Sequence, residues 1–162
     1  MADGTWVFIP TASSVLIGQQ FYQPSTDPAY DAPDTAFADV DAANVFVGFT
    51  PITSAAIVVA SFLCDLSGDG SQTTDKLLVN LRDASGDKAD TQQIVNRLVT
   101  STDAGITYRA TCYWSLTGLT ANVPYSVKMG FMKSDSHLTG TVHAGNHAGG
   151  DWGPITMLAY TA

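Results

Sequence analysis

The sequence predicts an all-β protein whose short antiparallel strands pack as a sandwich or a barrel. Three observations predict this class. The acidic residues are fifteen Asp and no Glu, and Asp favours turns whereas Glu is a strong helix former. Thr, Gly and Ser are abundant, with nineteen, fourteen and thirteen residues. Hydrophobic and polar residues alternate with a period of two along most of the chain, which is the pattern of strands with one buried face.

The length and composition fit one folded domain. A chain of 162 residues is near the commonest domain size and can bury a hydrophobic core without help from disulfides or metals. Forty-five per cent of the residues are hydrophobic and 14% are charged, the opposite of the balance that disordered chains show. No internal repeat is evident, so we expect a single unit of about eight to ten short strands.

The expected strands follow one another along the chain, separated by Gly-, Asp- and Ser-rich turns. They are residues 5–9, 15–22, 45–49, 58–66, 77–81, 94–99, 106–116, 125–131, 138–143 and 155–160. The clearest is 106–116, where six alternate residues from Ile106 to Leu116 are apolar. Residues 58–66 differ because Ile57, Val59 and Leu63 make their second face apolar too, which is typical of a sheet centre or a subunit contact. Residues 91–98 are the one stretch with a helical alternative.

Residues 23–43 have a different character. They hold three prolines and five Asp, which favours an extended connector over a core strand. The apolar and aromatic stretch before it, residues 5–22, is either an arm that reaches across a neighbouring surface or the first hairpin of the same sandwich. We therefore divide the chain into residues 1–36, holding this arm or hairpin and the connector, and a sandwich domain of residues 37–162.

The charge distribution limits the classes of partner. Residues 1–75 hold nine Asp and no basic residue, and the net charge of the whole chain is −8. An acidic chain without a basic run predicts no nucleic-acid binding and no attraction to anionic lipid. The start of the chain shows no basic segment followed by an apolar one, so we expect no signal peptide and synthesis in the cytoplasm. The most apolar window is also too short and too polar for membrane insertion.

Two patterns could bind metals. His143 and His147 are four residues apart with Asp151 nearby, but the glycines around them favour a loop over the helix that such a pair needs. Residues 65–70 resemble the start of a calcium loop, but Lys76 occupies the twelfth position where a bidentate Glu is required. A hairpin turn explains residues 65–70 better. We predict no metal site and no cofactor.

Other candidate side chains have simpler structural explanations. Cys64 and Cys112 are best explained as buried hydrophobic residues. If their strands are neighbours, a disulfide between them is the alternative. Trp6, Trp114 and Trp152 could stack on sugars, yet Trp114 lies on the inward face of its strand. No nucleophile motif occurs, and the Asp residues fall mostly in turns. We therefore predict no catalytic residue and no enzyme.

The C-terminal half carries a resemblance to a known family. Its motifs are Gly118-Leu119 followed by Tyr125-Ser126-Val127, then Gly140-Thr141-Val142-His143-Ala144, then Gly153-Pro154-Ile155-Thr156-Met157 in the closing strand. In this order they resemble the jelly-roll domains of bacteriophage virions, similar in outline to the C1q/TNF-like fold. The resemblance covers about residues 37–162.

The resemblance implies an antiparallel jelly-roll sandwich and a structural role. Its relatives are head decoration proteins, head fibres and tips of tail fibres, and they are typically homotrimers. We therefore expect a non-enzymatic phage virion protein, a capsid decoration or head-fibre protein on the outer surface of the particle. Its partners would be copies of itself and the major capsid protein or other virion proteins. The alternative is a receptor-binding tail-tip module that recognises host cell-surface glycan through loops such as residues 143–152. No functional residue is transferred, because such domains share a framework and not a catalytic set.

Overall fold

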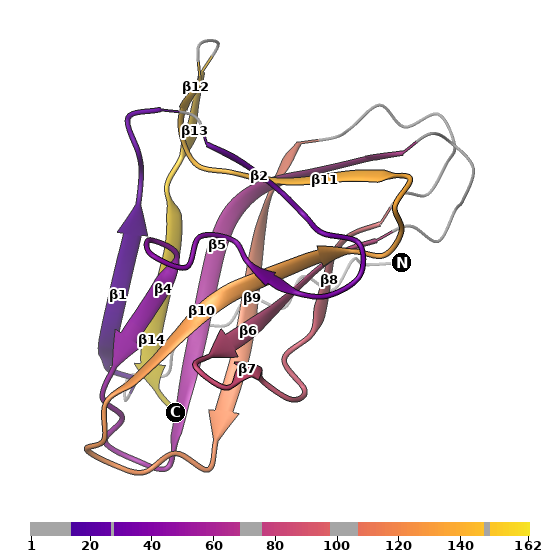
Figure 1. Cartoon of the computed structure of the whole chain (residues 1–162). Helices are drawn as coiled ribbons and strands as arrows, with labels where there is room; N and C mark the ends of the chain where they lie inside the picture. Colours follow the sequence, from indigo (N-terminus) through magenta and orange to yellow (C-terminus); the bar gives the residue numbers. More distant parts are fainter. Residues whose placement is uncertain (1–13, 27, 69–75, 98–106, 148–149) are drawn as a thin grey trace, which may run out of the picture.

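The computed structural model describes residues 14–26, 28–68, 76–97, 107–147 and 150–162. Within these residues the chain forms fourteen strands and no helix (Figure 1). The strands are β1 (Leu16–Tyr22), β2 (Ala29–Asp31), β3 (Ala38–Asp39), β4 (Phe46–Phe49), β5 (Ala55–Gly68), β6 (Lys76–Asp83), β7 (Gly86–Asp87), β8 (Gln93–Arg97), β9 (Tyr108–Thr117), β10 (Tyr125–Lys133), β11 (Leu138–His143), β12 (Gly145–His147), β13 (Gly150–Gly153) and β14 (Ile155–Thr161).

Sheet A is built around β5, which is fourteen residues long. One edge of β5 pairs with β9. Its other edge pairs with β14 along the first half of the strand and with β11 along the second half. The sheet is completed by β1 beside β14 and by β2 beside β11. Every one of these pairings is antiparallel.

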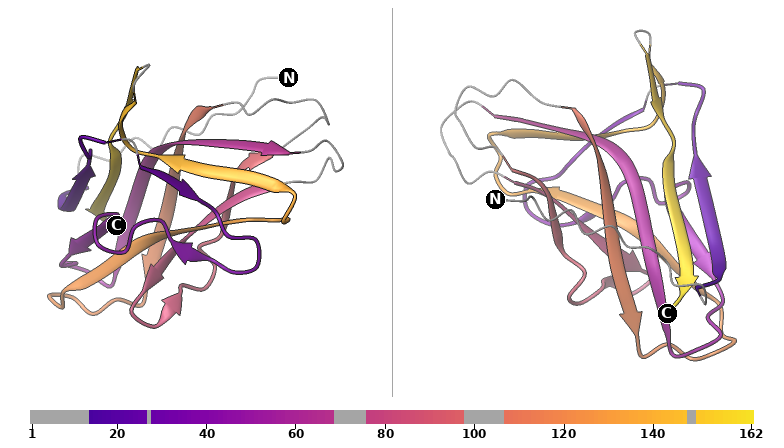
Figure 2. Two further views of the ribbon diagram at one scale, coloured as in Figure 1. Left: turned by 45° about the horizontal axis from the view of Figure 1, so that its top comes forward. Right: turned by 180° about the vertical axis from the view of Figure 1, so that it is seen from behind.

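Sheet B is built around β10. One edge of β10 pairs with β4 and β3, and the other pairs with β6. The far edge of β6 pairs with β7 and β8. Sheets A and B lie face to face (Figure 2). The remaining two strands, β12 and β13, form a hairpin that projects from one end of the sandwich (Figure 1).

The pairing order defines a jelly roll. Four antiparallel pairs are nested in the sequence: β1 with β14, β4 with β10, β5 with β9 and β6 with β8. The outermost and third pairs belong to sheet A, and the second and innermost belong to sheet B. Such nesting arises when one long antiparallel hairpin is wrapped so that its pairs alternate between two sheets. The predicted all-β jelly-roll sandwich is confirmed.

The core lies between the two sheets and follows the alternation in the sequence. Along β9 the even-numbered residues from Ala110 to Leu116 are buried and the residues between them are exposed. Along β5 the even-numbered residues from Ala56 to Leu66 are completely buried. Trp114 is 3% exposed, and its indole nitrogen donates a hydrogen bond of 2.5 Å to the Thr91 carbonyl oxygen. A buried Trp needs such an acceptor for its N–H group.

The strands predicted from alternation are confirmed wherever the structure describes them, with differences of a few residues at their ends. The prediction for residues 5–9 lies outside the described residues. Residues 93–97 form a strand, so the helical alternative for residues 91–98 is wrong. Five strands of two to four residues were not predicted, namely β2, β3, β7, β12 and β13. Segments this short contain too few alternate positions to show a period.

The segment expected as an extended connector crosses from sheet A to sheet B and adds a short strand to each. Its backbone is hydrogen-bonded to both sheets: Ala32 N donates to Gly140 O at 2.7 Å, and Val40 N donates to Met129 O at 2.9 Å. Ala32 and Val40 are also buried in the core. These contacts supply partners for a proline-rich backbone that cannot form a continuous ladder. The division of the chain at residue 37 stays a prediction.

One side of the sandwich is closed where β1 approaches β4. A Cβ atom at Gly18 would lie 2.3 Å from the Gly48 carbonyl oxygen and 2.9 Å from the Phe49 Cβ. Nearby, the Gln20 side-chain nitrogen donates a hydrogen bond of 3.3 Å to the Asn44 carbonyl oxygen. The two strand edges therefore come this close only because residue 18 has no side chain.

We predict that Gly18→Ala lowers the free energy of unfolding by about 1–3 kcal/mol, because the added methyl group must push β1 away from β4. Gly48→Ala is the matched control, since its Cβ would meet only the Tyr125 carbonyl oxygen at 3.9 Å, and it should change stability by no more than about 0.5 kcal/mol. Urea unfolding of both variants measures the difference. Equal midpoints for the two variants would contradict the proposed closure.

Candidate interaction surface

The outer face of sheet A carries apolar side chains on β1, β5, β9 and β14, interrupted on β1 by Gln19, and we call this set the apolar face. Strand register aligns Val59 with Tyr113 on one side and with Leu158 on the other. Phe21 is 58% exposed and Leu16 is 44% exposed. The members of the apolar face are Leu16, Phe21, Ile57, Val59, Tyr113, Leu158 and Tyr160. The outer face of an antiparallel sheet is usually polar, so an apolar one indicates a contact surface.

The same sheet becomes polar beyond the apolar face, at the end where β5 pairs with β11. The His143 Nε2 lies 2.8 Å from the Asp65 Oδ2. The Thr141 hydroxyl donates to the Asp31 Oδ1 at 3.2 Å. The Arg109 guanidinium donates to the Pro154 carbonyl oxygen at 3.4 Å. Sheet A therefore presents an apolar region and a hydrogen-bonded polar region side by side.

The sequence singled out part of this surface. Ile57, Val59 and Leu63 gave β5 a second apolar face. The structure places Ile57 and Val59 in the apolar face, whereas Leu63 is aligned between Arg109 and His143 in the polar region. The contribution of β14 was missed, although Leu158 and Tyr160 alternate with buried Met157 and Ala159 and give that strand a second apolar face too. Neither strand alone shows that the four side chains lie together, because only the register brings them into one patch.

The residues of the histidine pattern are only partly brought together. His143 ends β11 and contacts Asp65. Residues 145–147 and 150–153, expected as a loop, instead form the β12–β13 hairpin, where Asn146 is paired with Asp151. The side chains of His147 and Asp151 lie outside the described residues. Within the part of the chain that the structure describes, no three His, Cys, Asp or Glu side chains are grouped as a metal site would require.

The segment that resembled a calcium loop is part of a strand. Residues 65–68 belong to β5, and the Asp65 carboxylate contacts His143. The strands on either side of this segment, β5 and β6, lie in different sheets. The hairpin turn expected here is therefore wrong, because the chain leaves one sheet and enters the other. Residues 69–75 are outside the described residues.

The tryptophans considered for sugar stacking do not form a described site. Trp114 is in the core, as expected. Trp6 lies outside the described residues. The backbone of Trp152 belongs to β13, but its side chain is not among those described. No described segment is a helix of the length and hydrophobicity needed to span a membrane.

The two cysteines are free and buried. Cys64 is paired in register with Tyr108, and Cys112 is paired with Ala60, so the two thiols are offset by four residues along adjacent strands. Four residues correspond to about 13 Å of strand, which is too far for a disulfide. Burial raises the pKa of both thiols to about 12. The arrangement fits the prediction that both are core residues.

Comparisons with known proteins define the fold and no family. No family model and no curated protein matches the chain. A search of solved structures finds dimeric latent PorU from Porphyromonas gingivalis, with a TM-score of 0.50 and 8% identity. The match covers 90% of this chain but only 13% of PorU. At this identity the likeness concerns the fold alone.

Two further solved structures are similar in outline. The Eiger TNF protein of S. frugiperda has a TM-score of 0.41 and 9% identity, with 91% of this chain and 92% of that chain covered. The VP2 subviral particle of infectious bursal disease virus has a TM-score of 0.41 and 11% identity, with 93% and 37% covered. The strand order by itself defines the class of protein as an antiparallel jelly roll.

We predict that neither cysteine reacts with a thiol reagent in the native protein at pH 8, because both thiols are buried and stay protonated far above their ordinary pKa. Two thiols per chain should react in denaturant without a reductant. Titration with a chromogenic disulfide reagent measures both states. Fewer than two thiols in denaturant would indicate a disulfide and contradict the register.

Proposed function

We propose that the chain is a non-enzymatic structural protein of a bacteriophage particle, a capsid decoration or head-fibre protein that acts on the outer shell as a homotrimer. The observation that carries the proposal is the apolar face. A virion surface protein has to associate strongly with its partners and needs no catalytic site. A jelly roll with an apolar outer face has a surface suited to such association. The order of motifs along the C-terminal half supports the same family of proteins.

Association between copies would bury the apolar face. Removing apolar surface from water contributes about 25 cal/mol per Å², which makes the exposed Phe21 and Leu16 side chains costly to leave in water. In a closed ring of copies related by rotational symmetry, each copy covers part of its neighbour. Every apolar face in the ring is then buried. The polar region next to the apolar face can set the register of such a contact, as polar groups do around a hydrophobic interface core.

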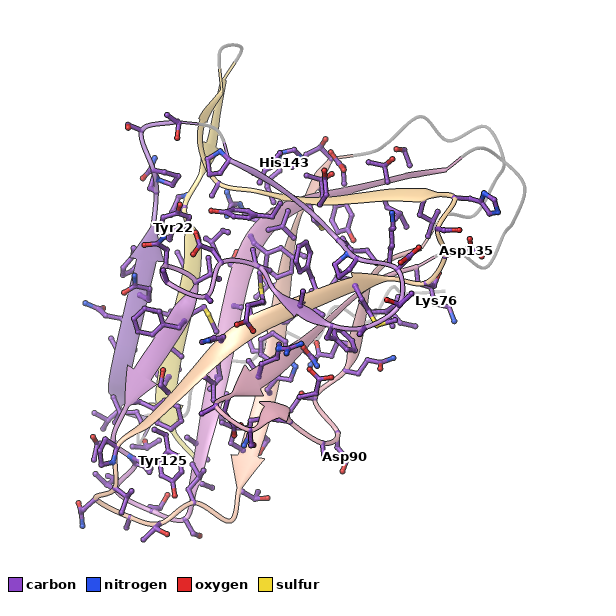
Figure 3. The ribbon with its side chains drawn as sticks, viewed as in Figure 1. Tyr22, Lys76, Asp90, Tyr125, Asp135 and His143 are labelled. Atoms are coloured by element: carbon purple, nitrogen blue, oxygen red, sulfur yellow. The ribbon has the colours of Figure 1, made fainter. Side chains whose placement is uncertain are left out.

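A second candidate function is a receptor-binding tail-tip module that recognises cell-surface glycan. A pocket lined in part by Tyr125 at the start of β10 favours this alternative. It lies at the opposite end of the sandwich from His143 (Figure 3), so it differs from the segment 143–152 that the sequence suggested for glycan contacts. The two functions differ in where the protein is found on the particle.

We predict that Phe21→Asp weakens self-association at least tenfold, because an ionised carboxylate on the apolar face must be desolvated in the contact. Leu158→Asp tests the centre of the same face. Ile52→Asp is the matched control, since Ile52 is 60% exposed in the loop between β4 and β5 and lies outside the face. Sedimentation velocity over a range of concentrations measures the association. A wild-type protein that stays at 17 kDa at all concentrations would contradict the trimer.

The position on the particle separates the two functions. We expect gold-labelled antibody against this protein to decorate the head surface of virions in electron micrographs. Antibody that has been absorbed with the purified protein is the control. Label found only at the tail tip would contradict the decoration role and support the receptor-binding alternative.

A further inference from the structure

A shallow pocket of about 480 Å³ lies between the β6–β7 turn and the start of β10. Its volume is within the range of small-molecule sites. Figure 3 places Tyr125 at this end of the sandwich, where β10 begins. The pocket is lined by Asp83, Ala84, Ser85, Pro124, Tyr125, Ser126 and Lys128. None of these residues belongs to the apolar face.

The wall formed by the β6–β7 turn is fixed by the Asp83 carboxylate. Its Oδ1 accepts hydrogen bonds from the Ser85 backbone nitrogen at 2.8 Å and from the Ser85 hydroxyl at 2.6 Å. Its Oδ2 pairs with the Lys88 ammonium at 2.9 Å. The bonds from the Ser85 side chain, from Lys88 and from the Ser85 backbone lower the pKa of Asp83 to about 2. The pocket therefore presents an ionised carboxylate in a fixed position at neutral pH.

The opposite wall is formed by the start of β10 and is equally constrained. The Tyr125 ring stacks on Phe49 with the ring centroids 6.0 Å apart and the planes inclined by 22°. The Tyr125 hydroxyl accepts a hydrogen bond of 2.8 Å from the Thr120 backbone nitrogen. Pro124 adds a rigid ring. A site whose walls are held by such contacts loses little conformational entropy when a ligand binds.

The charged groups of the pocket are already paired within the protein. Lys128 Nζ contacts the Asp39 carboxylate at 3.1 Å, and Asp83 is paired with Lys88. An anionic ligand would face the Asp83 carboxylate, and a cationic ligand would face Lys128 and Lys88. The pocket thus gives no net attraction to either sign of charge.

The lining combines apolar surface with several hydrogen-bonding groups. Ala84, Pro124 and Tyr125 supply the apolar part. The Ser126 hydroxyl and the Lys128 ammonium can donate hydrogen bonds, and the Asp83 Oδ2 keeps one acceptor lone pair beyond the bond it accepts from Lys88. A sugar ring has a matching character, with hydroxyl groups around its rim and C–H groups on its faces. We infer that this pocket binds a neutral saccharide, with the sugar hydroxyls on Asp83, Ser126 and Lys128 and a C–H face on the apolar lining.

This inference does not depend on the assembly role, but it rests on the same pocket as the receptor-binding alternative. The trimer is tested by sedimentation and the pocket by ligand titration, so either proposal can fail while the other stands. The pocket is formed by a single chain, and the wild-type protein can be titrated in whatever oligomeric state it adopts.

The probes are methyl glucoside, methyl galactoside and N-acetylglucosamine as neutral sugars, with sialyllactose as an anionic one. We expect at least one neutral sugar to shift the backbone amide NMR signals of Ser85 and Ser126 in a saturable way. Ser126→Phe should weaken that binding at least tenfold, because Ser126 is exposed on the outer face of sheet B and a bulky side chain there fills the pocket. Ala84→Phe tests the other wall and replaces Ser126→Phe if that variant does not fold.

Ser136→Phe is the matched control, because Ser136 is exposed in the turn between β10 and β11, away from the pocket. It should bind the neutral sugar as the wild type does. Three results would overturn the inference: no saturable shift with any neutral sugar, full binding by both pocket-filling variants, or binding of sialyllactose alone.

Discussion

The structure depends above all on β5, a strand that is hydrogen-bonded along both edges while its alternate side chains fill the core. Six side chains from Ala56 to Leu66 point inward and are completely buried. Its partners on one edge change from β14 to β11 near Phe62, so one strand holds both halves of sheet A together. A shift of one residue in its register would turn all six buried side chains to the outside. This strand forms the third nested pair with β9 and also holds β14 of the outermost pair in place.

The outer faces of the two sheets differ in the side chains that cover them. On sheet B, Arg82 pairs with Asp39 and with Asp87, each at 2.9 Å, and Lys128 also contacts Asp39. The Arg82 side chain occupies space left by Gly130, where a Cβ would lie 2.4 Å from the Arg82 Cδ. Sheet B is thus covered by its own ion pairs, which tie the connector segment to the strands. The outer face of sheet A has no such charged cover over the apolar face among the described residues.

This difference separates the two proposed activities in space. The apolar face is broad and lies on one sheet, as a surface for contact with another copy should. The saccharide pocket is small, lies at the end of the other sheet, and has its charges compensated inside the chain. Assembly through sheet A would leave the Asp83 turn and the start of β10 outside the contact.

The sequence by itself determined the class of fold and the identity of the core. The alternation in residues 106–116 and 58–66 names the buried side chains, because a strand has only two faces and the apolar one must leave water. Turn residues separated the strands along the chain, and the absence of Glu disfavoured helices. The position of Trp114 in the core followed from the same alternation, since it shares a face with five other apolar residues.

Only the tertiary structure decided how strands distant in sequence align. Register decides the four-residue offset of Cys64 and Cys112 and the joining of β5 and β14 into one apolar face. Register and the packing of one sheet against the other decide where the Asp83 turn meets Tyr125. The alternation fixes which face of each strand is buried but is unchanged by a shift of two residues. Long-range hydrogen bonds and close approaches such as Gly18 against Gly48 select one alignment, and no local pattern in the sequence encodes them.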